Sequence, residues 1–548
     1  MIKMEEEHVM PGAMPRDLLF EGTAGQQLHR ALYKHSYFPE AIVDSHTHEI
    51  ISYAKILDMS CRLAVSFQKY GLTQNNIIGI CSENNLNFFN PVIAAFYLGI
   101  TVATVNDTYT DRELSETLNI TKPQMLFCSK GISLPIVMKT MKIMPYVQKL
   151  LIIDSMQDIG GIECVHSFVS RYTDEHFDPL KFVPLDFDPR EQVALIMTSS
   201  GTTGLPKGVM LTHRNICVRF VHSRDPLFGT RFIPETSILS LVPFHHAFGM
   251  FTTLSYFIVG LKIVMMKRFD GELFLKTIQN YKIPTIVIAP PVMVFLAKSH
   301  LVDKYDLSSI KEIATGGAPL GPALANAVAK RLKLGGIIQG YGLTETCCAV
   351  LITPHNKIKT GSTGGIVLPY VTAKIVDTKT GKNLGPNQTG ELCFKSDIIM
   401  KGYYQNEEET RLVIDKDGWL HSGDIGYYDT DGNFHIVDRL KELIKYKAYQ
   451  VAPAELEALL LQHPYIADAG VTGIPDEEAG ELPAACVVLE PGKTMTEKEV
   501  MDYIAERVTP TKRLRGGVLF VNNIPKGATG KLVRTELRRL LTQRAAKL

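Results

Sequence analysis

The segment TSSGTTGLPKGV, from Thr198 to Val209, constrains the fold of this chain more than any other, because it gathers hydroxyls, glycines and one lysine between two apolar runs. The apolar residues 193–197 predict a buried strand, and residues 209–212 predict a second one. The segment therefore predicts a loop that joins strand to strand. A P-loop would need Ser or Thr after its lysine and then a helix, whereas Gly208 and a strand follow Lys207 here, which excludes a P-loop NTPase.

The residue types of this loop favour the binding of a polyphosphate such as that of ATP. Glycines let successive backbone amides converge on phosphate oxygens, and a lysine supplies a mobile positive charge. The candidate phosphate ligands are Ser199, Ser200, Thr202, Thr203 and Lys207. The alternative is a solvent-exposed hairpin turn, since Gly, Ser, Thr and Pro also dominate turns for conformational reasons.

Length, charge and cysteine usage narrow the class of protein. A chain of 548 residues exceeds what one hydrophobic core usually supports, so at least two domains are expected. Lys and Arg number 58 against 57 acidic residues and form no long single-sign block, so nucleic acid is not expected as a partner. The nine cysteines are scattered without a C-x-x-C pair, which predicts reduced thiols.

Both ends of the chain bear on its location. The acidic N-terminal segment lacks the apolar core of a signal peptide, so secretion is not expected. The longest apolar run, 247–261, is too short and polar to span a bilayer. We therefore expect this run to lie in the hydrophobic core, and we expect no membrane partner. The last residues, Ala546, Lys547 and Leu548, are a close variant of the S-K-L tripeptide and predict a peroxisomal import receptor as partner and a peroxisomal location. The alternative is a chance ending of a basic helix.

Strand-like and helix-like segments alternate along most of the chain. Residues 76–81, 124–128 and 149–154 have strand patterns, residues 50–70 carry apolar side chains at helical spacing, and 285–289 followed by a helix repeats the unit. This alternation is typical of parallel sheets with crossover helices. We therefore expect an α/β fold whose large N-terminal body consists of α/β subdomains with mixed sheets.

The character of the sequence changes near Asp438. A Gly- and Asp-rich hairpin at 429–433 gives way to a charged connector at 438–441 and then to an independent unit with a βαβ-like pattern. We expect an N-terminal domain at 1–438 and a small, mobile α+β lid at 439–548, with the hinge at 438–441. The predicted lid elements are helices at 454–462 and 496–508, the latter opened by the capping pattern of Thr496 and Glu499, and strands at 469–474 and 484–489.

Four further clusters follow the loop in a fixed order. They are QGYGLTET at 339–346, WLHSGD at 419–424, the pair Asp438-Arg439, and PKGATGK at 525–531. Taken alone, each has an ordinary structural explanation as a helix cap, a turn or a solvated lysine. In this order, together with the loop, they resemble the signatures of the adenylate-forming enzymes, which include acyl-CoA synthetases, peptide-synthetase adenylation domains and beetle luciferases.

This resemblance implies ATP and Mg²⁺ as cofactors. It places Tyr341 near the adenine, Thr344 on the α-phosphate, Glu345 on Mg²⁺, and Asp424 and Arg439 on the ribose. It also implies that Lys531 enters the site and stabilises charge on the carboxylate and α-phosphate, an effect worth several kcal/mol for such groups. The nucleotide-binding set is Ser199, Ser200, Thr202, Thr203, Lys207, Gly317, Ala318, Gln339, Gly340, Tyr341, Gly342, Thr344, Asp424, Arg439 and Lys531.

Other strings resemble the beetle luciferases in particular. They are PFHHAFGMF at 243–251, CVRFVHSRDP at 217–226, TGGAP at 315–319 and LIKYKAYQVAP at 443–453. The resemblance implies a luciferin pocket, with His246 beside the substrate carboxylate, where a group of pKa near 6.5 suits proton management. The implied substrate-binding set is Arg219, His246, Phe248, Thr252, Gly316, Gly317 and Cys348. A metal site at His245-His246 is not expected, since adjacent histidines point to opposite sides.

The activity that follows is that of a luciferin 4-monooxygenase, with D-luciferin as substrate and O₂ as co-substrate. Lys531 serves adenylation, the lid then turns and brings in Lys445, and His246 and Thr344 complete the catalytic set. The chain departs from firefly-type sequences at Ala448, where they carry Gly, and at 347–348, where Cys-Cys replaces Thr-Ser. If position 448 needs a positive φ, alanine costs about 1 kcal/mol or more.

Two other functions stay open at this point. A fatty acyl-CoA synthetase of the same fold would use Lys445 and the rotated lid to pass the acyl group to CoA, which would then be a further cofactor. An inactive adenylate-binding protein is disfavoured because the charged motif residues are retained, namely Lys207, Glu345, Asp424, Arg439 and Lys531.

Overall fold

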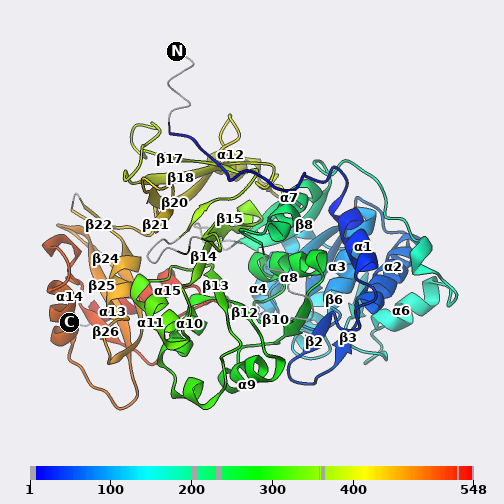
Figure 1. The fold of residues 1–548 in the computed structure, drawn as a ribbon, viewed down its shortest axis with the longest axis horizontal. Helices are drawn as coiled ribbons and strands as arrows, with labels where there is room; N and C mark the ends of the chain where they lie inside the picture. The colour runs from blue at the N-terminus through cyan, green and yellow to red at the C-terminus, as the bar shows by residue number, and fades with distance from the viewer. Residues whose placement is uncertain are drawn as a thin grey trace.

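The computed structural model describes residues 8–199, 206–229, 237–356, 358, 364–447, 449–527 and 530–545. Predictions for Ser200, Thr202 and Thr203, for Ala448, and for the C-terminal residues 546–548 therefore lie outside the described residues. In Figure 1 three sheets with their helices form a large body, and the C-terminal segment forms a smaller unit at one end of it.

A seven-stranded sheet holds the first candidate motif, in the order β19-β9-β8-β5-β4-β6-β7. The strands β7, β6, β4, β5 and β8 are mutually parallel, and β9 runs antiparallel to β8, so the motif lies in a strand-loop-strand hairpin as predicted. The bounds are β4 Ile77–Cys81, β5 Thr101–Val105, β6 Met125–Cys128, β7 Lys149–Ile152, β8 Val193–Ser199, β9 Lys207–Thr212 and β19 Gly402–Tyr403.

Helices on this half of the body are α1 Ala24–Lys34, α2 Tyr53–Tyr70, α3 Phe89–Leu98, α4 Asp111–Thr121, α5 Ser133–Met141, α6 Val165–Tyr172 and the short η1 Pro179–Lys181. The helix predicted at 50–70 starts later than expected, because Ile50–Ile51 form strand β3 on β2 (Ile42–Asp44). The Ser52 side chain then accepts the Lys55 N–H at 3.1 Å and caps the helix.

A nine-stranded sheet runs in the order β16-β15-β14-β13-β12-β10-β11-β2-β3. From β2 to β14 its strands are parallel, so the carboxyl ends of β13 and β14 meet at one edge, with Gly316 opposite Gly340. This register brings TGGAP and QGYGLTET together. The bounds are β10 Ser237–Ser240, β11 Lys262–Met265, β12 Thr285–Ile288, β13 Glu312–Gly316, β14 Ile338–Leu343, β15 Cys348–Ile352 and β16 Ile366–Val367.

The helices of this sheet include α8, Ala247–Val259, whose side chains are almost all buried. The apolar run at 247–261 is therefore core, as predicted. None of the helices in the described ranges is long and apolar enough to cross a membrane. The others are α7 His213–Arg224, α9 Gly271–Tyr281, α10 Pro290–Lys298, η2 His300–Lys304, α11 Pro322–Arg331 and η3 Thr344–Thr346.

An antiparallel sheet in the order β1-β17-β18-β20-β21 completes the body. It carries WLHSGD on β20 and Asp438-Arg439 at the end of β21, and these two strands pair so that Asp424 lies opposite Arg439. The bounds are β1 Met10–Pro11, β17 Thr372–Val376, β18 Gly390–Lys395, β20 Leu420–Tyr428 and β21 Phe434–Arg439, with α12 Glu407–Val413 alongside.

The chain changes sheets between Arg439 and Ile444, and the C-terminal unit has its own apolar core. The predicted strand regions pair antiparallel as β24 and β25, and the βαβ pattern is formed by β25, α14 and the parallel β26. The capping box of Thr496 and Glu499 is confirmed. The bounds are β22 Ile444–Tyr446, β23 Tyr449–Val451, α13 Pro453–Leu460, β24 Ile466–Asp476, β25 Gly480–Leu489, α14 Glu497–Ala505, η4 Pro510–Lys512, β26 Val518–Phe520 and α15 Arg534–Ala545. The exact boundary and the hinge at 438–441 stay predictions.

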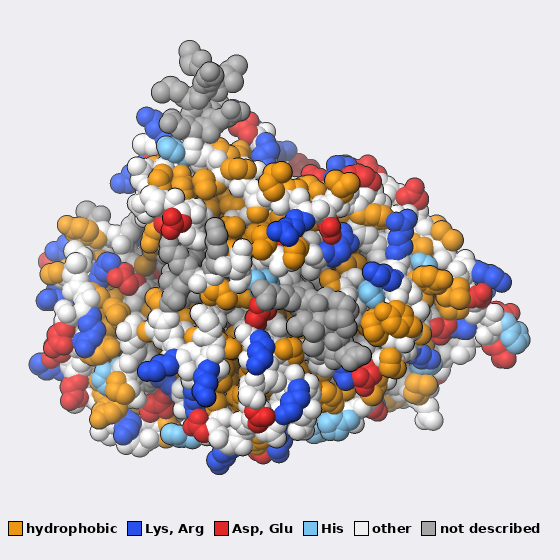
Figure 2. All heavy atoms as spheres, viewed as in Figure 1, with side chains coloured by type: hydrophobic (Ala, Val, Ile, Leu, Met, Phe, Trp, Pro, Cys, Tyr) orange, Lys and Arg blue, Asp and Glu red, His pale blue; other side chains and the backbone are white. Residues whose placement is uncertain are grey.

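The structure shows the state of the cysteines and the distribution of charge on one face of the molecule. All nine cysteines are free thiols, and eight of them are buried. On the face shown in Figure 2, basic and acidic side chains are intermixed rather than gathered by sign.

Candidate active site

The lysine of the phosphate loop is held by an acidic partner. Lys207 begins β9, and its Nζ lies 2.6 Å from Glu409 Oε2 on α12 and 5.0 Å from the centre of the Tyr403 ring. The Lys207 side chain is only 11% exposed. A phosphate entering this point would therefore exchange one anionic partner of the lysine for another.

Glu345, the predicted Mg²⁺ ligand, lies on the short helix η3 beside the same tyrosine. Its Oε1 accepts the Tyr403 hydroxyl at 3.0 Å, and its backbone carbonyl accepts the Met400 N–H at 2.9 Å. Mg²⁺ usually takes one or two protein carboxylates and completes its shell with phosphate and water oxygens. One carboxylate held next to the phosphate loop fits that need.

The segment QGYGLTET was expected to follow a strand, but it begins inside one, since β14 runs from Ile338 to Leu343. Its glycines allow the backbones of β14 and β15 to lie unusually close together. A Cβ on Gly342 would lie 1.8 Å from the Cys348 carbonyl oxygen, so only glycine lets β14 and β15 approach this closely.

The predicted ribose ligands form a coupled group. The Tyr341 hydroxyl donates to Asp424 Oδ2 at 2.6 Å, and Arg439 Nε lies 3.2 Å from Asp424 Oδ1. Burial raises the pKa of Asp424, while the Arg439 guanidinium opposes that shift. The carboxylate thus has its two oxygens oriented in advance by two different residues.

Lys531 reaches this group from the C-terminal unit. It follows Gly530, whose φ of +78° and close approach to Pro291 on α10 leave no room for a side chain. Burial, reinforced by the Arg439 charge, lowers the pKa of Lys531 to about 8, with Glu442, Asp424 and Glu345 opposing the shift. The structure therefore brings a lysine of the C-terminal unit into the field of Asp424 and Glu345, the carboxylates predicted to bind ribose and Mg²⁺.

His246 caps helix α8 and also lies in the field of Lys531. Its Nδ1 accepts the Phe248 N–H at 3.3 Å. Burial lowers its pKa to about 4, with contributions from the charges of His245 and Lys531. The ring is therefore neutral at pH 7, and because Nδ1 is an acceptor, Nε2 carries the proton that it can donate to a substrate oxygen. His245 points elsewhere, with Nδ1 3.5 Å from Asp107, as predicted.

Arg219, on α7, is a buried cation whose donors are not all hydrogen-bonded within the described residues. Its residue is 8% exposed, and neither its Nε nor its Nη1 has a hydrogen-bond partner among the described residues. A buried guanidinium with idle donors costs free energy that a bound acceptor would recover. Arg219 interacts electrostatically with Tyr256 on α8 and with Cys348 on β15, which places it between the predicted pocket elements.

The remaining predicted pocket residues surround the ends of α8 and β13. Gly317 has a φ of +84°, and a Cβ there would lie 3.9 Å from the Phe248 ring. Thr252, one turn along α8, donates its hydroxyl to the Phe248 carbonyl at 2.6 Å. A Cβ on Gly316 would lie 2.8 Å from the Gly340 carbonyl oxygen, so glycine is required for the close contact of β13 with β14. Ala318 is half-buried beside them.

The two cysteines that replace Thr-Ser share a strained backbone. Cys347 has a φ of 51° and Cys348 a φ of 82°, both in the left-handed region that residues with a Cβ rarely adopt. The Thr346 hydroxyl donates to the Cys348 carbonyl at 2.7 Å and helps to hold this turn. Such strain is found mostly where the surrounding structure fixes a functional conformation.

Lys445, the other predicted catalytic lysine, is not brought to this place. It lies on β22 with an exposed side chain, and its backbone N–H donates to Glu481 Oε2 at 2.8 Å. The structure thus presents one lysine of the C-terminal unit to the body and leaves the other on the surface. The role of Lys445 stays a prediction.

Three residues of this region were missed by sequence reasoning. Glu409 pairs with Lys207, Tyr403 holds Glu345, and Glu442 is among the charges that act on Lys531. Nothing in the local sequence distinguishes them from surface charges or from a core tyrosine. They are found only once the structure places them beside Lys207, Glu345 and Lys531.

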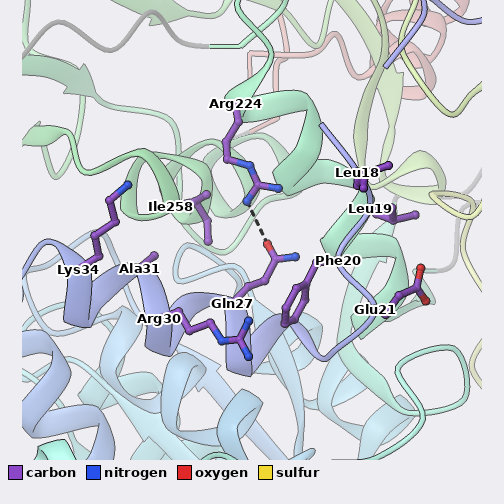
Figure 3. Close-up of a pocket in the computed structure, with 10 residues that line it drawn as sticks. All are labelled: Leu18, Leu19, Phe20, Glu21, Gln27, Arg30, Ala31, Lys34, Arg224 and Ile258. Atoms are coloured by element: carbon purple, nitrogen blue, oxygen red, sulfur yellow. Dashed lines mark hydrogen bonds between the residues drawn. The ribbon is translucent and has the colours of Figure 1, made fainter. Parts of the chain in front are cut away.

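A groove of about 490 Å³ lies away from this site, between the N-terminal segment, α1 and α7 (Figure 3). Its lining includes Gln27, whose Oε1 accepts a hydrogen bond from Arg224 Nη1 at 3.5 Å, and Phe20, whose ring centre lies 4.9 Å from the Arg30 guanidinium. None of the predicted site residues lines it.

A mixed-sheet body, a small C-terminal unit and a lysine that this unit directs toward the body's carboxylates together define the adenylate-forming class of fold. The chain belongs to the AMP-binding enzyme family: the model of the AMP-binding enzyme matches residues 29–404, and that of the AMP-binding enzyme C-terminal domain matches residues 455–531.

Individual relatives narrow the comparison. The chain is 54% identical to a luciferin 4-monooxygenase of Photinus pyralis, over 98% of each chain. It is 63% identical to the solved structure of a natural red emitting luciferase from Phrixothrix hirtus, which covers 98% of this chain and 99% of that one with a TM-score of 0.75. A 4-coumarate–CoA ligase of Nicotiana tabacum is 39% identical over 91% of this chain and 90% of its own length.

Proposed function

We propose that this protein is a luciferase, a luciferin 4-monooxygenase that activates D-luciferin with ATP and oxidises the product with O₂ to emit light. The observation that carries the proposal is identity of 54% over 98% of both chains with a protein named for that reaction. The 4-coumarate–CoA ligase covers nearly the same length at 39%, so the chain resembles the light-producing branch more than this ligase.

In the first half-reaction the luciferin carboxylate attacks the α-phosphorus of ATP, and pyrophosphate leaves. The buried Asp424, oriented by Tyr341 and Arg439, accepts hydrogen bonds from the two ribose hydroxyls. Lys531 stabilises the charge that develops between carboxylate and α-phosphate, and the Nε2–H of neutral His246 donates a hydrogen bond to a carboxylate oxygen. These assignments follow from where the side chains converge.

In the second half-reaction the carbon next to the acyl group loses a proton and adds O₂. The terminal peroxide oxygen attacks the acyl carbon and displaces AMP, and the four-membered ring that forms loses CO₂ and leaves an excited ketone that emits. Lys445 is exposed in this arrangement, so we propose that the lid turns about 438–441 and presents Lys445 to the adenylate. The idle donors of Arg219 would meet a polar group of the luciferin heterocycle.

We further propose Mg²⁺ as a cofactor, and CoA as the additional cofactor of the alternative function. Glu345 supplies a carboxylate beside the phosphate loop and would hold Mg²⁺ together with phosphate oxygens, which shields their charge during attack. CoA would enter if the rotated lid also allows thioester formation, the reaction of the runner-up function, a fatty acyl-CoA synthetase.

The direct experiment is photon counting on purified protein in air with MgATP and D-luciferin, beside a control without ATP. ATP-dependent light supports the luciferase. Darkness combined with pyrophosphate release on addition of a fatty acid and CoA would replace the proposal with the synthetase. Omitting Mg²⁺ with a chelator present is expected to abolish both reactions.

We also propose a peroxisomal location, from the sequence of the last three residues, Ala546, Lys547 and Leu548. The test fuses the last dozen residues to a fluorescent protein, with a matched fusion that ends in Ala-Lys-Ala. Punctate signal that depends on the final leucine supports import. Diffuse signal from both fusions would contradict it.

A further inference from the structure

A cluster of three side chains of different chemistry lies on the antiparallel sheet of the body, outside the site described above. Glu391 and Cys393 are two positions apart on β18, and His421 lies opposite Cys393 on the paired strand β20. Within the described ranges this group places one carboxylate oxygen, one sulfur and one ring nitrogen within 4.8 Å of one another. We propose that it is a binding site for a soft divalent cation, with Zn²⁺ as the ion that fits best.

The distances match the geometry of such a site. Cys393 Sγ lies 3.5 Å from His421 Nδ1. In a tetrahedral zinc site, with Zn–S of about 2.3 Å and Zn–N of about 2.0 Å, these two atoms are about 3.5 Å apart. Glu391 Oε2 lies 2.9 Å from His421 Nδ1, so a carboxylate shift of a few tenths of an ångström admits the ion. One position stays open for water.

Residues behind the ligands already orient them. His421 Nε2 lies 3.5 Å from Asp415 Oδ2, so the ring turns Nδ1 toward the cluster. The other oxygen of Asp415 accepts the N–H groups of Asp417 and Trp419, each at 2.9 Å, and is thereby fixed. A carboxylate behind a histidine is the usual support of a zinc ligand.

The cluster also has the right access and charge. Cys393 is fully buried, whereas the side chains of His421 and Glu391 are 32% and 14% exposed, so an ion can arrive from their side. Lys374, opposite Cys393 on β17, has its Nζ 4.4 Å from the centre of the Trp419 ring. Two anionic ligands, the Glu391 carboxylate and the Cys393 thiolate, would balance the charge of a divalent cation.

A site of this kind would connect two strands next to the nucleotide group. His421 precedes Asp424 by three positions on β20, and the Gly423 N–H donates to Glu391 Oε1 at 3.0 Å. The ion would therefore bridge β18 and β20 beside the carboxylate that we assign to the ribose.

The test uses the reduced, chelator-treated full chain, with Co²⁺ as spectroscopic probe and Zn²⁺ competition against a fluorescent chelator for affinity. We expect one tight equivalent and a thiolate-to-cobalt charge-transfer band. Cys393→Ser should remove the band, His421→Asn should weaken Zn²⁺ binding at least as much as Asp415→Asn, and Asp415→Asn should weaken it by about 10- to 100-fold. The matched controls Cys486→Ala and His463→Asn, both in the C-terminal unit, should bind like the parent.

The proposal would be overturned by any of three results. They are a parent protein without the band, a band that persists in Cys393→Ser, or an Asp415→Asn variant with the parent's affinity. Circular dichroism of every variant separates loss of the ligand from loss of the fold. Asp415→Asn replaces a partly exposed side chain, so it keeps the test valid if Cys393→Ser does not fold.

Discussion

The candidate site holds buried charges in two opposite ways. One is found at its nucleotide end, around Lys207, Asp424 and Arg439, and the other at its acyl end, around Arg219. At the nucleotide end two of the cations have anionic partners: Lys207 contacts Glu409, and Arg439 contacts Asp424. At the acyl end the buried Arg219 has two donors without a hydrogen-bond partner among the described residues. A ligand at the first end exchanges partners, whereas a ligand at the second supplies a missing one.

The difference has an energetic meaning. Exchange of one paired ion for another changes the free energy little, so the nucleotide end gains specificity more than raw affinity. A buried, unsatisfied donor costs about 1–3 kcal/mol, which the ligand recovers. The unsatisfied donors at the acyl end therefore lower the stability of the free protein and raise its affinity for the acyl substrate.

The largest effect is expected at Lys531, which both ends share. Lys531→Gln should lower adenylation of luciferin by about 10²- to 10³-fold, the size known for loss of one group that stabilises developing charge. Light from preformed luciferyl adenylate should be spared. Pyrophosphate release and light from synthetic adenylate measure the two steps. Lys526→Gln, at the lysine that lies 2.6 Å from Asp468, is the control. Equal loss in both assays would refute the division of roles.

Arg219 tests the acyl end. Arg219→Met should raise the KM for luciferin by a factor of about 10 to 150, since a hydrogen bond to a charged group is worth about 1.5–3 kcal/mol. The Tm should stay equal or rise, because an unpaired buried charge is removed. The matched control Arg214→Met breaks a 2.9 Å contact with Asp397 and should lower the Tm without changing that KM. If the two variants behave alike, the contrast between the ends is wrong.

The pH dependence of adenylation follows from Lys531. Its pKa in the free enzyme is lowered to about 8 by burial and by Arg439, and the protonated form is the one that stabilises anionic charge. At low ATP, where the rate reports the free enzyme, adenylation should therefore be fully active well below pH 8 and fall as the pH rises through 8. Rapid-mixing measurements of pyrophosphate release at low ATP report it.

Lys531→Arg provides the check on this profile, because a guanidinium stays protonated in proteins. Its rate is expected to be lower but flat across the same range. A parent and an arginine variant that lose activity in parallel would assign the titration to another group.

The smallest effect is expected at Glu409. Glu409→Gln releases Lys207 from a partly exposed ion pair worth about 0.2–1 kcal/mol, so the KM for ATP should fall by a factor of about 1.4 to 5. Glu408→Gln, at the adjacent position on α12, is the control. A rise in the KM for ATP would mean that the glutamate helps to hold the nucleotide rather than compete with it.

The strands and helices were largely predictable because local pattern and tertiary environment agree in them. Val193–Ser199 and Met125–Cys128 are apolar runs in a sheet covered on both sides, and the capping box of Thr496 and Glu499 is a local signal. The start of α2 was missed because Ile50 and Ile51 continue the helical spacing but pair with β2. Pairing between distant segments overrides local periodicity there.

The site was predictable in its chemistry and not in its contacts. The lysine after a glycine loop at 525–531 pointed to a catalytic role by resemblance. Its pKa near 8 comes from burial and from the charge of Arg439, with Glu442 opposing the shift, and both of these residues lie far from it in sequence. Likewise the cluster of Cys393 and His421 has no spacing that a sequence motif would reveal, because its ligands come from two strands.

The sequence by itself determined most of the strands and helices and the family, since these depend on residue types at short spacing and on the order of the motifs. Only the tertiary structure decided which charges meet. It paired Lys207 with Glu409 and left two donors of Arg219 without a partner in the part of the chain that the structure describes. It also buried Lys531 beside the body while Lys445 stayed exposed. The physical reason is that partner choice and desolvation depend on distances across elements, and these are set only when sheets and lid pack together.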